Sequence, residues 1–180
     1  PPAVNKYNSV LDLSTAGGSQ IIAQTKESAD MGMPQTLTEF INYCTALYPA
    51  KHYGLIFWDH GAGPLWGYGS DELFGNDSIL LEELRRAMDA SVFGPGRKLD
   101  WVGFDACLMG NLENAKLWKN YAQYLVASEE LEPGRGWDYT CLEILNNTTD
   151  AREITSRIVD AYGQYYEKNR TPFFNPDVTL

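Results

Sequence analysis

The chain has 180 residues, a size that predicts one compact domain spanning residues 1–180. Its composition, 44% hydrophobic and 21% charged, excludes a disordered or collagen-like chain. The formal net charge of −10 argues against a nucleic-acid partner, because phosphate contacts need clustered Lys and Arg, and it favours cationic partners instead.

The first predicted helix begins at Thr36. Thr36 and Glu39 have the spacing of a capping box, in which hydroxyl and carboxylate satisfy free backbone N–H groups. Pro49 ends the helix. The sequence predicts Cys44 as a small core residue, because it shares a helical face with other apolar residues. That face consists of Leu37, Phe40, Ile41, Cys44 and Leu47.

Short apolar runs then alternate with segments of helical periodicity, which is typical of an α/β domain with a largely parallel sheet. A glycine-rich loop over 61–77 follows the first of these runs. Strands are predicted over 53–58, 99–104 and 124–127, and helices over 80–88, 112–118 and 150–168.

Polar residues follow each predicted strand, and two of them form a chemically competent pair. His60 follows the first strand and Cys107 the second, and a right-handed crossover places both at one edge of the sheet. A thiolate attacks a carbonyl carbon while an imidazole protonates the leaving amine. Simpler alternatives remain: Cys107 is a buried small residue, His60 is an ordinary loop histidine, and 61–63 is only a turn.

The other cysteines do not suggest a metal site. The chain has three cysteines, no C-x-x-C spacing and two histidines, so a closed zinc site is not expected. The odd count leaves at least one thiol outside any intramolecular disulfide. Cys141 is expected to pack in a short helix.

Several linked motifs in the second half of the chain carry a family resemblance. They are FWDHGAG at 57–63, GFDACLMG at 103–110, ASEE at 127–130 and PGRGW at 133–137. In this order they resemble the clostripain family of cysteine peptidases, which belongs to a caspase-like clan with gingipains and legumains. The resemblance covers about residues 30 to 180. It implies a caspase-like three-layer α-β-α sandwich with a mainly parallel central sheet, and further strands before Pro1 and after Leu180.

The resemblance also implies roles for individual residues. His60 corresponds to the dyad histidine and Cys107 to the nucleophile of a cysteine endopeptidase, which forms a thioester acyl-enzyme. The backbone N–H groups of Gly61 and Cys107 correspond to the oxyanion hole. Asp105 corresponds to the acid at the base of the S1 pocket, where it pairs with a substrate Arg or Lys. An alternative is that Asp105 only accepts backbone N–H groups at the end of its strand.

The loop after the third strand is expected to wall this pocket. Glu129 and Asp138 are the candidate S1 residues there, although Glu129 is alternatively a solvated surface residue and Asp138 a helix cap. Arg135 lies in the same loop. If its guanidinium turned inward, it would compete with a basic substrate for Asp105.

Two family properties are uncertain in this chain. Family members typically cleave themselves after a basic residue in the loop that follows the histidine, but from Gly61 to Leu84 there is no Lys or Arg, and the first is Arg85. We therefore expect no self-cleavage in this loop. No cofactor is expected, although Asp71, Glu72 and Asp77 offer oxygen ligands for an activating calcium ion without matching an EF-hand.

The expected partner is a peptide or protein substrate with a basic residue at the cleavage site. No membrane span is expected, because no apolar run reaches about 18 residues. No signal peptide is visible, and the resemblance alone suggests a secreted or cell-envelope protein. The alternative function is a catalytically silent α/β binding or assembly module. A dinucleotide-binding module is disfavoured, because Trp66 stands where its fingerprint needs glycine.

Overall fold

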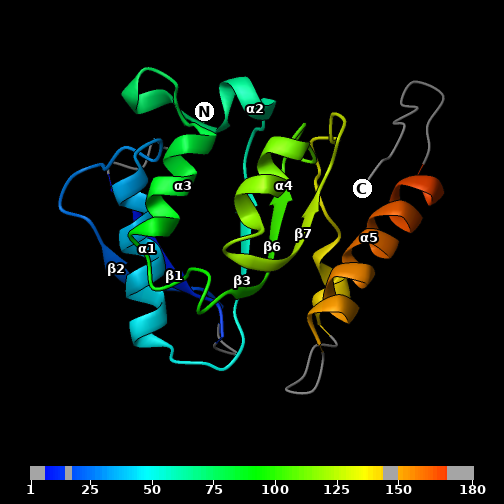
Figure 1. Cartoon of the computed structure of the whole chain (residues 1–180), viewed down its shortest axis with the longest axis horizontal. Helices are drawn as coiled ribbons and strands as arrows, with labels where there is room; N and C mark the ends of the chain where they lie inside the picture. The colour runs from blue at the N-terminus through cyan, green and yellow to red at the C-terminus, as the bar shows by residue number, and fades with distance from the viewer. Residues whose placement is uncertain (1–6, 15–17, 144–149, 170–180) are drawn as a thin grey trace.

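The computed structural model describes residues 7–14, 18–143 and 150–169 (Figure 1). Strands and helices alternate along most of the chain, as the sequence predicts. The elements in order are β1 (Ser9–Asp12), β2 (Gln20–Gln24), α1 (Pro34–Leu47), β3 (Gly54–Trp58), α2 (Gly63–Trp66), β4 (Tyr68–Asp71), η1 (Glu72–Phe74), β5 (Asp77–Ile79), α3 (Leu81–Asp89), β6 (Leu99–Asp105), α4 (Leu112–Trp118), β7 (Ala122–Ala127), η2 (Tyr139–Leu142) and α5 (Ala151–Lys168).

The central sheet is parallel, with the strand order β3-β6-β7. Its strands are nearly continuous apolar runs because helices cover both faces. Phe57 pairs with Phe104 and Trp58 pairs with Asp105 in the β3–β6 register. The Phe57 and Phe104 rings stack, with centroids 4.6 Å apart and planes 9° apart. This contact fixes the register one residue before the end of each strand.

Two hydrophobic clusters, one on each face of the sheet, give the domain three layers. Figure 1 shows α1, α3 and α4 on one side of the sheet and α5 on the other. The first cluster joins the sheet to Ile41 of α1, Leu84 of α3 and Trp118 of α4. The second joins it to Ile158 and Tyr162 of α5. The predicted α-β-α sandwich is therefore confirmed.

The start of α1 differs from the prediction. The helix begins at Pro34, and Met33 is its N-cap without a side-chain capping bond. Thr36 lies within the first turn, and its hydroxyl donates to the carbonyl of Asp30 across 2.6 Å. The capping box predicted at Thr36 is wrong, because a proline at the first helical position begins the helix two residues earlier.

The predicted apolar face of α1 is only partly covered. Ile41 is buried and Cys44 is half-buried, whereas Phe40 and Leu47 remain 42% and 47% exposed. The antiparallel hairpin β1–β2, which the sequence analysis did not identify, lies beside this face. Together with α1 and β3 it encloses an apolar hollow of about 740 Å³ that Phe40 helps to line.

The glycine-rich segment after β3 is structured. It contains the one-turn helix α2, the short helix η1 and the antiparallel hairpin β4–β5. Gly67, with φ +77°, lies so close to β5 that a Cβ would sit 2.3 Å from the Ile79 carbonyl oxygen. Figure 1 shows α2 at the end toward which the arrowheads of β6 and β7 point. In the described residues, none of the helices is both long and apolar enough to cross a membrane.

Candidate active site

Two loops leave the sheet side by side at the carboxyl ends of β3 and β6. Trp58 and Asp105 are register partners at these ends, and His60 and Cys107 each follow two residues later. Because the strands are parallel, equal offsets bring both loops to the same edge of the sheet. This arrangement confirms that the predicted histidine and thiol belong to one edge.

Gly61 is packed directly against the main chain of Cys107. A Cβ atom at position 61 would lie 2.0 Å from the Cys107 carbonyl oxygen and 3.0 Å from the Met109 side chain. Only glycine fits this contact. Within the described residues, neither the Gly61 N–H nor the Cys107 N–H donates a hydrogen bond. These are the two N–H groups that the resemblance assigns to an oxyanion hole, and this role stays a prediction.

The chain turns sharply after Cys107. Leu108 adopts φ +60°, a left-handed conformation that side chains disfavour. The Asn111 side-chain amide donates to the Leu108 carbonyl across 2.9 Å, and the Asn111 carbonyl oxygen caps α4 at Asn114 N–H. Local hydrogen bonds in this turn therefore hold Cys107 between the end of β6 and the start of α4.

Asn114 supports the same turn from inside the protein. It is completely buried, its amide donates to the Met109 carbonyl across 2.8 Å, and its carbonyl oxygen accepts the Trp118 indole N–H across 2.9 Å. A buried amide with both ends satisfied holds its neighbours in one arrangement. The sequence analysis missed this residue, because nothing in its spacing marks it as buried.

The loop after β7 is hydrogen-bonded to the loop that carries Cys107. Leu108 N–H donates to the Glu130 carbonyl across 3.0 Å, and Gly110 N–H donates to the Ser128 carbonyl across 2.7 Å. A Cβ at Gly110 would lie 2.8 Å from the Ala127 carbonyl oxygen. The segment that begins at Ser128 is therefore anchored beside Cys107.

Asp105 is buried, with 4% of its surface exposed. Its carboxylate accepts the Trp137 N–H across 3.1 Å and the Tyr139 hydroxyl across 2.8 Å. Gly136, at φ +69°, allows this approach, because a Cβ there would lie 2.5 Å from Asp105 Oδ1. The bond from the Trp137 N–H agrees with the alternative stated from the sequence, in which Asp105 accepts a backbone N–H group. The S1 role of Asp105 stays a prediction.

Glu132 is a further acidic residue at this site, and the sequence analysis did not single it out. Its main-chain N–H donates to Cys107 Sγ across 3.2 Å, and its carbonyl oxygen lies 3.8 Å from the same sulfur. Both carboxyl oxygens are buried and form no hydrogen bond with the described residues. Burial, followed by the adjacent Asp105 carboxyl, raises the pKa of Glu132 to about 8.

The other predicted wall residues lie further out. Glu129 is exposed. Asp138 caps η2, accepting Thr140 N–H across 3.1 Å and its hydroxyl across 2.7 Å, and these bonds lower the Asp138 pKa. Their S1 roles remain predictions. The Arg135 guanidinium lies over the Tyr165 ring, 4.8 Å from its centroid, so it is directed to α5 and not to Asp105.

His60 is exposed on the loop after β3. Its main-chain carbonyl accepts Gly69 N–H across 2.8 Å, which ties the loop to the β4–β5 hairpin. Its imidazole forms no hydrogen bond or ion pair with any described residue. The ring is therefore accessible to a substrate that approaches the edge of the sheet.

All three cysteines are free thiols, and their surroundings differ. Burial raises the pKa of Cys44 on α1 and of Cys141 in η2. Cys141 packs against the α5 cluster from a short helix, as predicted. Of the three, Cys107 is the one that follows a central strand, at the sheet edge to which the His60 loop also leads.

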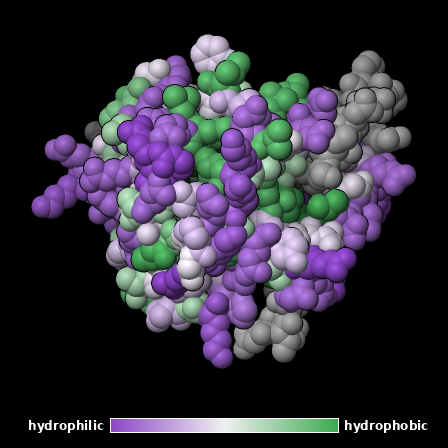
Figure 2. Space-filling view, in the orientation of Figure 1, coloured by the Kyte–Doolittle hydropathy of each residue, from purple (hydrophilic) through white to green (hydrophobic). Residues whose placement is uncertain are grey.

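Exposed apolar side chains lie on the elements around this edge: the end of β3, helix α2, the start of α4 and the loop after β7. Figure 2 shows hydrophobic residues reaching the surface among hydrophilic ones at the end of the molecule where α2 lies. Five apolar side chains on these elements are between 68% and 82% exposed, and a group of such residues is typical of a binding surface. They are Trp58, Leu65, Trp66, Leu112 and Leu131.

The residues considered for calcium have structural contacts. Asp71 accepts the N–H groups of Met31 and Leu73, both across 3.0 Å. Asp77 lies against Gly32. Among the described residues, no group of three or more His, Cys, Asp or Glu is placed to hold a metal ion. Calcium activation therefore stays a prediction.

Comparison with known proteins finds relatives of this chain among cysteine proteases. Over 138 residues it is 30% identical to clostripain from Hathewaya histolytica, which is 67% of this chain and 25% of that protein. A secreted C11 cysteine protease from Bacteroides thetaiotaomicron, solved with an irreversible peptide inhibitor, superposes with a TM-score of 0.78 at 21% identity, covering 97% of this chain and 49% of that one.

An inactive zymogen C11 protease from Parabacteroides distasonis superposes with a TM-score of 0.66 at 23% identity, covering 88% of this chain and 44% of that one. The chain thus spans about a quarter of the length of clostripain and about half of each solved protease. The two superpositions support the caspase-like α/β fold. A model of the clostripain family matches residues 5–180, and the chain belongs to that family.

Proposed function

We propose that this protein is a cysteine endopeptidase that cleaves peptide bonds after a basic residue. The observation that carries the proposal is the register of β3 and β6, which sets His60 and Cys107 at equal offsets on one edge, with Gly61 packed against the nucleophile. Membership in a cysteine protease family supports the same chemistry.

In the proposed reaction, the Cys107 thiolate attacks the scissile carbonyl carbon and forms a C–S bond. The carbonyl oxygen becomes an oxyanion that accepts hydrogen bonds from the Gly61 and Cys107 N–H groups. His60 donates a proton to the departing amine as the C–N bond breaks, leaving a thioester. Water then hydrolyses the thioester and restores the thiol.

The candidate specificity residue is Asp105. It is buried below the nucleophile on β6, and the chain offers no cation to it among the described residues. A buried carboxylate favours a substrate that brings a positive charge and disfavours one that leaves it unpaired. The net charge of −10 also attracts cationic peptides. The apolar rim formed by Trp58, Leu65, Trp66, Leu112 and Leu131 suits contacts with the flanking residues of a peptide.

The proposal is tested by substrate profiling of the wild type beside Cys107→Ala and Asp105→Ala. We expect cleavage after Arg or Lys in the wild type, no turnover in Cys107→Ala, and loss of the basic preference in Asp105→Ala. An unchanged preference in Asp105→Ala would refute the pocket assignment. Because a related protease is described as secreted, we also propose a location outside the cytoplasm for this protein.

A catalytically silent binding module of the same fold is the alternative. Alkylation distinguishes the two: loss of peptidase activity in proportion to modification of Cys107, with Cys44 and Cys141 unmodified, supports an enzyme. If the reduced wild-type protein hydrolyses no Arg or Lys peptide amide, the binding module becomes the better description.

A further inference from the structure

A carboxyl pair lies next to Cys107, and no described residue supplies a cation to it. Asp105 comes from β6 and Glu132 from the loop that follows β7, and their carboxyl groups interact directly. The Asp105 carboxylate has two hydrogen-bond donors, whereas the Glu132 oxygens have none among the described residues. The Trp137 indole N–H, which faces Glu132, is also buried and has no partner in hydrogen-bond geometry among the described residues. Buried polar groups left unpaired in this way are uncommon and call for an explanation.

None of the described residues that face the pair carries a positive charge. Arg135, the basic residue of the loop, stacks on Tyr165 of α5. The other titratable groups facing the pair are neutral or acidic in character: Tyr68 on β4, Cys107 after β6, Tyr139 in η2, and Tyr162 and Tyr166 on α5. Two adjacent carboxylates cannot both stay ionised at low cost in such a site.

Hydrogen bonding differs between the two carboxyl groups. The Trp137 main-chain N–H and the Tyr139 hydroxyl both donate to Asp105, whereas the Glu132 oxygens have no partner in hydrogen-bond geometry among the described residues. The Trp137 indole N–H faces Glu132 and opposes part of the pKa shift, but burial and the adjacent Asp105 carboxyl outweigh it. The neutral form of Glu132 is therefore favoured, and its O–H can donate toward Asp105.

We propose that Asp105 and Glu132 hold one proton between them in the substrate-free protein, and that the cationic side chain of a substrate displaces this proton on binding. Glu132 is then a specificity-determining residue of the site. The inference rests on the proposed basic specificity and adds its regulation by protons. In the step, the Glu132 O–H bond breaks, the proton passes to solvent, and the pair changes from one negative charge to two beside one bound cation.

Proton displacement has a consequence for binding. Because binding of the cation and release of the proton are linked, affinity for a cation rises with pH while Glu132 is protonated, by at most about tenfold per pH unit. A neutral ligand of the same shape has no reason to displace the proton. The site therefore discriminates more strongly for charge as the pH rises.

The test is titration calorimetry of the purified protein with benzamidine at pH 6.5, in buffers of different ionisation enthalpy. The dependence of the observed enthalpy on the buffer gives the number of protons released. We expect about one for the wild type and none for Glu132→Gln, which binds with an affinity that does not vary with pH. Glu143→Gln, which changes an exposed glutamate just after η2, is the matched control and is expected to release the proton.

A second measurement uses the wild-type protein alone, so it does not require that Glu132→Gln folds. With the glutamate side-chain carboxyl carbons labelled with ¹³C, we expect one resonance of the wild type to titrate well above the others and to shift to its ionised position when benzamidine is added. Benzamidine binding without proton release, or glutamates that all titrate in the ordinary range, would overturn the inference and leave cleavage after Arg or Lys standing. Absence of both benzamidine binding and Arg or Lys cleavage would overturn it together with the proposed specificity.

Discussion

The main-chain N–H of Glu132 donates a hydrogen bond to the sulfur of Cys107 across 3.2 Å. Glu132, in the loop after β7, thus contacts Cys107 through its backbone and Asp105 through its side chain. An N–H aimed at sulfur stabilises the negative charge of a thiolate. A substrate that displaces Glu132 would therefore change the surroundings of the Cys107 sulfur and of the Asp105 carboxylate at the same time.

Substitution of Gly61 by alanine is expected to abolish most activity. The added methyl group would lie 2.0 Å from the Cys107 carbonyl oxygen, so the two loops must separate. Moving the N–H donors of the proposed oxyanion hole away from the reacting carbonyl costs about 10²-fold or more in kcat/KM. The measurement is steady-state kinetics with an arginine peptide amide.

Gly163→Ala provides the matched control for Gly61→Ala. Position 163 lies within α5, with open space around a new Cβ. This substitution is expected to leave kcat/KM unchanged and to stabilise the protein by about 0.5–1 kcal/mol, because alanine favours helix. Equal kcat/KM values for Gly61→Ala and Gly163→Ala would contradict the expectation that activity requires the close contact between Gly61 and Cys107.

Asn114→Ala is expected to destabilise the protein by about 2–4 kcal/mol. The change leaves the Met109 carbonyl and the Trp118 indole N–H buried without partners, at roughly 1–3 kcal/mol each. Urea unfolding followed by tryptophan fluorescence measures the loss. Asn120→Ala, at an exposed position after α4, should stay within about 0.5 kcal/mol of the wild type.

The stability of the protein is expected to fall as the pH rises from about 5 to 8 because of Glu132. The unfolded chain ionises this carboxyl above its ordinary pKa of 4.5, whereas the folded protein retains the proton until the pH approaches about 8. The fall is at most about 1.4 kcal/mol per pH unit, the slope for one proton. Glutamine does not ionise, so unfolding of Glu132→Gln measured across this range should lack that part of the decline. Parallel curves for the two proteins would contradict the raised pKa.

Iodoacetamide is expected to modify Cys107 before the other two thiols. Burial raises the pKa of Cys44 and Cys141, which lowers their thiolate fraction near neutral pH. Peptide mapping by mass spectrometry at increasing times gives the order of labelling. Faster labelling of Cys44 or Cys141 than of Cys107 would contradict the expectation that Cys107 is the most reactive of the three thiols.

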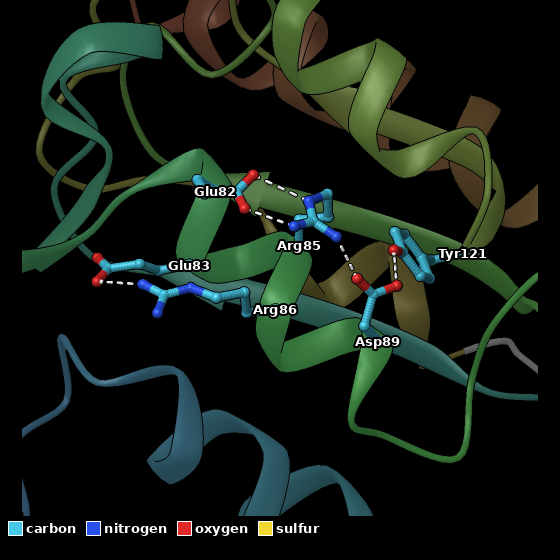
Figure 3. A network of polar contacts seen from close by, with 6 residues as sticks. All are labelled: Glu82, Glu83, Arg85, Arg86, Asp89 and Tyr121. Carbon is cyan, nitrogen blue, oxygen red and sulfur yellow. Dashed lines mark hydrogen bonds and ion pairs between the residues drawn. The ribbon is translucent and has the colours of Figure 1, made fainter.

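No self-cleavage is expected between residues 61 and 84. The first basic residue beyond His60 is Arg85, and Figure 3 shows it held on α3 between Glu82 and Asp89. Asp89 also accepts the Tyr121 hydroxyl across 2.5 Å. These contacts keep Arg85 within a regular helix, where a peptidase does not readily bind the backbone. Gel electrophoresis and intact-mass measurement of the purified protein provide the check, and a fragment that forms in the wild type but not in Cys107→Ala would contradict the expectation.

The central sheet and its main helices were predictable because their signals are local. The runs that became β3, β6 and β7 are mostly apolar, and the helices between them have clear periodicity. The end of the first helix near Pro49 was also predicted. The β4–β5 hairpin was not, because glycines such as Gly67 and Gly69 take positive φ values that composition alone does not reveal.

Only the part of the candidate site that lies at the strand ends could be predicted from the sequence. His60 and Cys107 follow apolar strands, so the sheet edge that they share could be inferred from topology. Glu132, 25 residues beyond Cys107, reaches the thiol only because the loop after β7 folds back across the site. That contact depends on Gly136 and on packing against α5, which no spacing in the sequence encodes.

Because Trp58 pairs with Asp105, the chain is expected to tolerate an inserted residue at some positions and not at others. One residue inserted between Phe57 and His60 would reverse which face of β3 its side chains occupy, or displace His60 from its place opposite Cys107. An insertion near Gly75, at the tip between β4 and β5, changes neither offset, and a Cβ there meets open space. A scan of single-residue insertions should therefore find tolerance at the hairpin tip and intolerance within a few residues of either strand end.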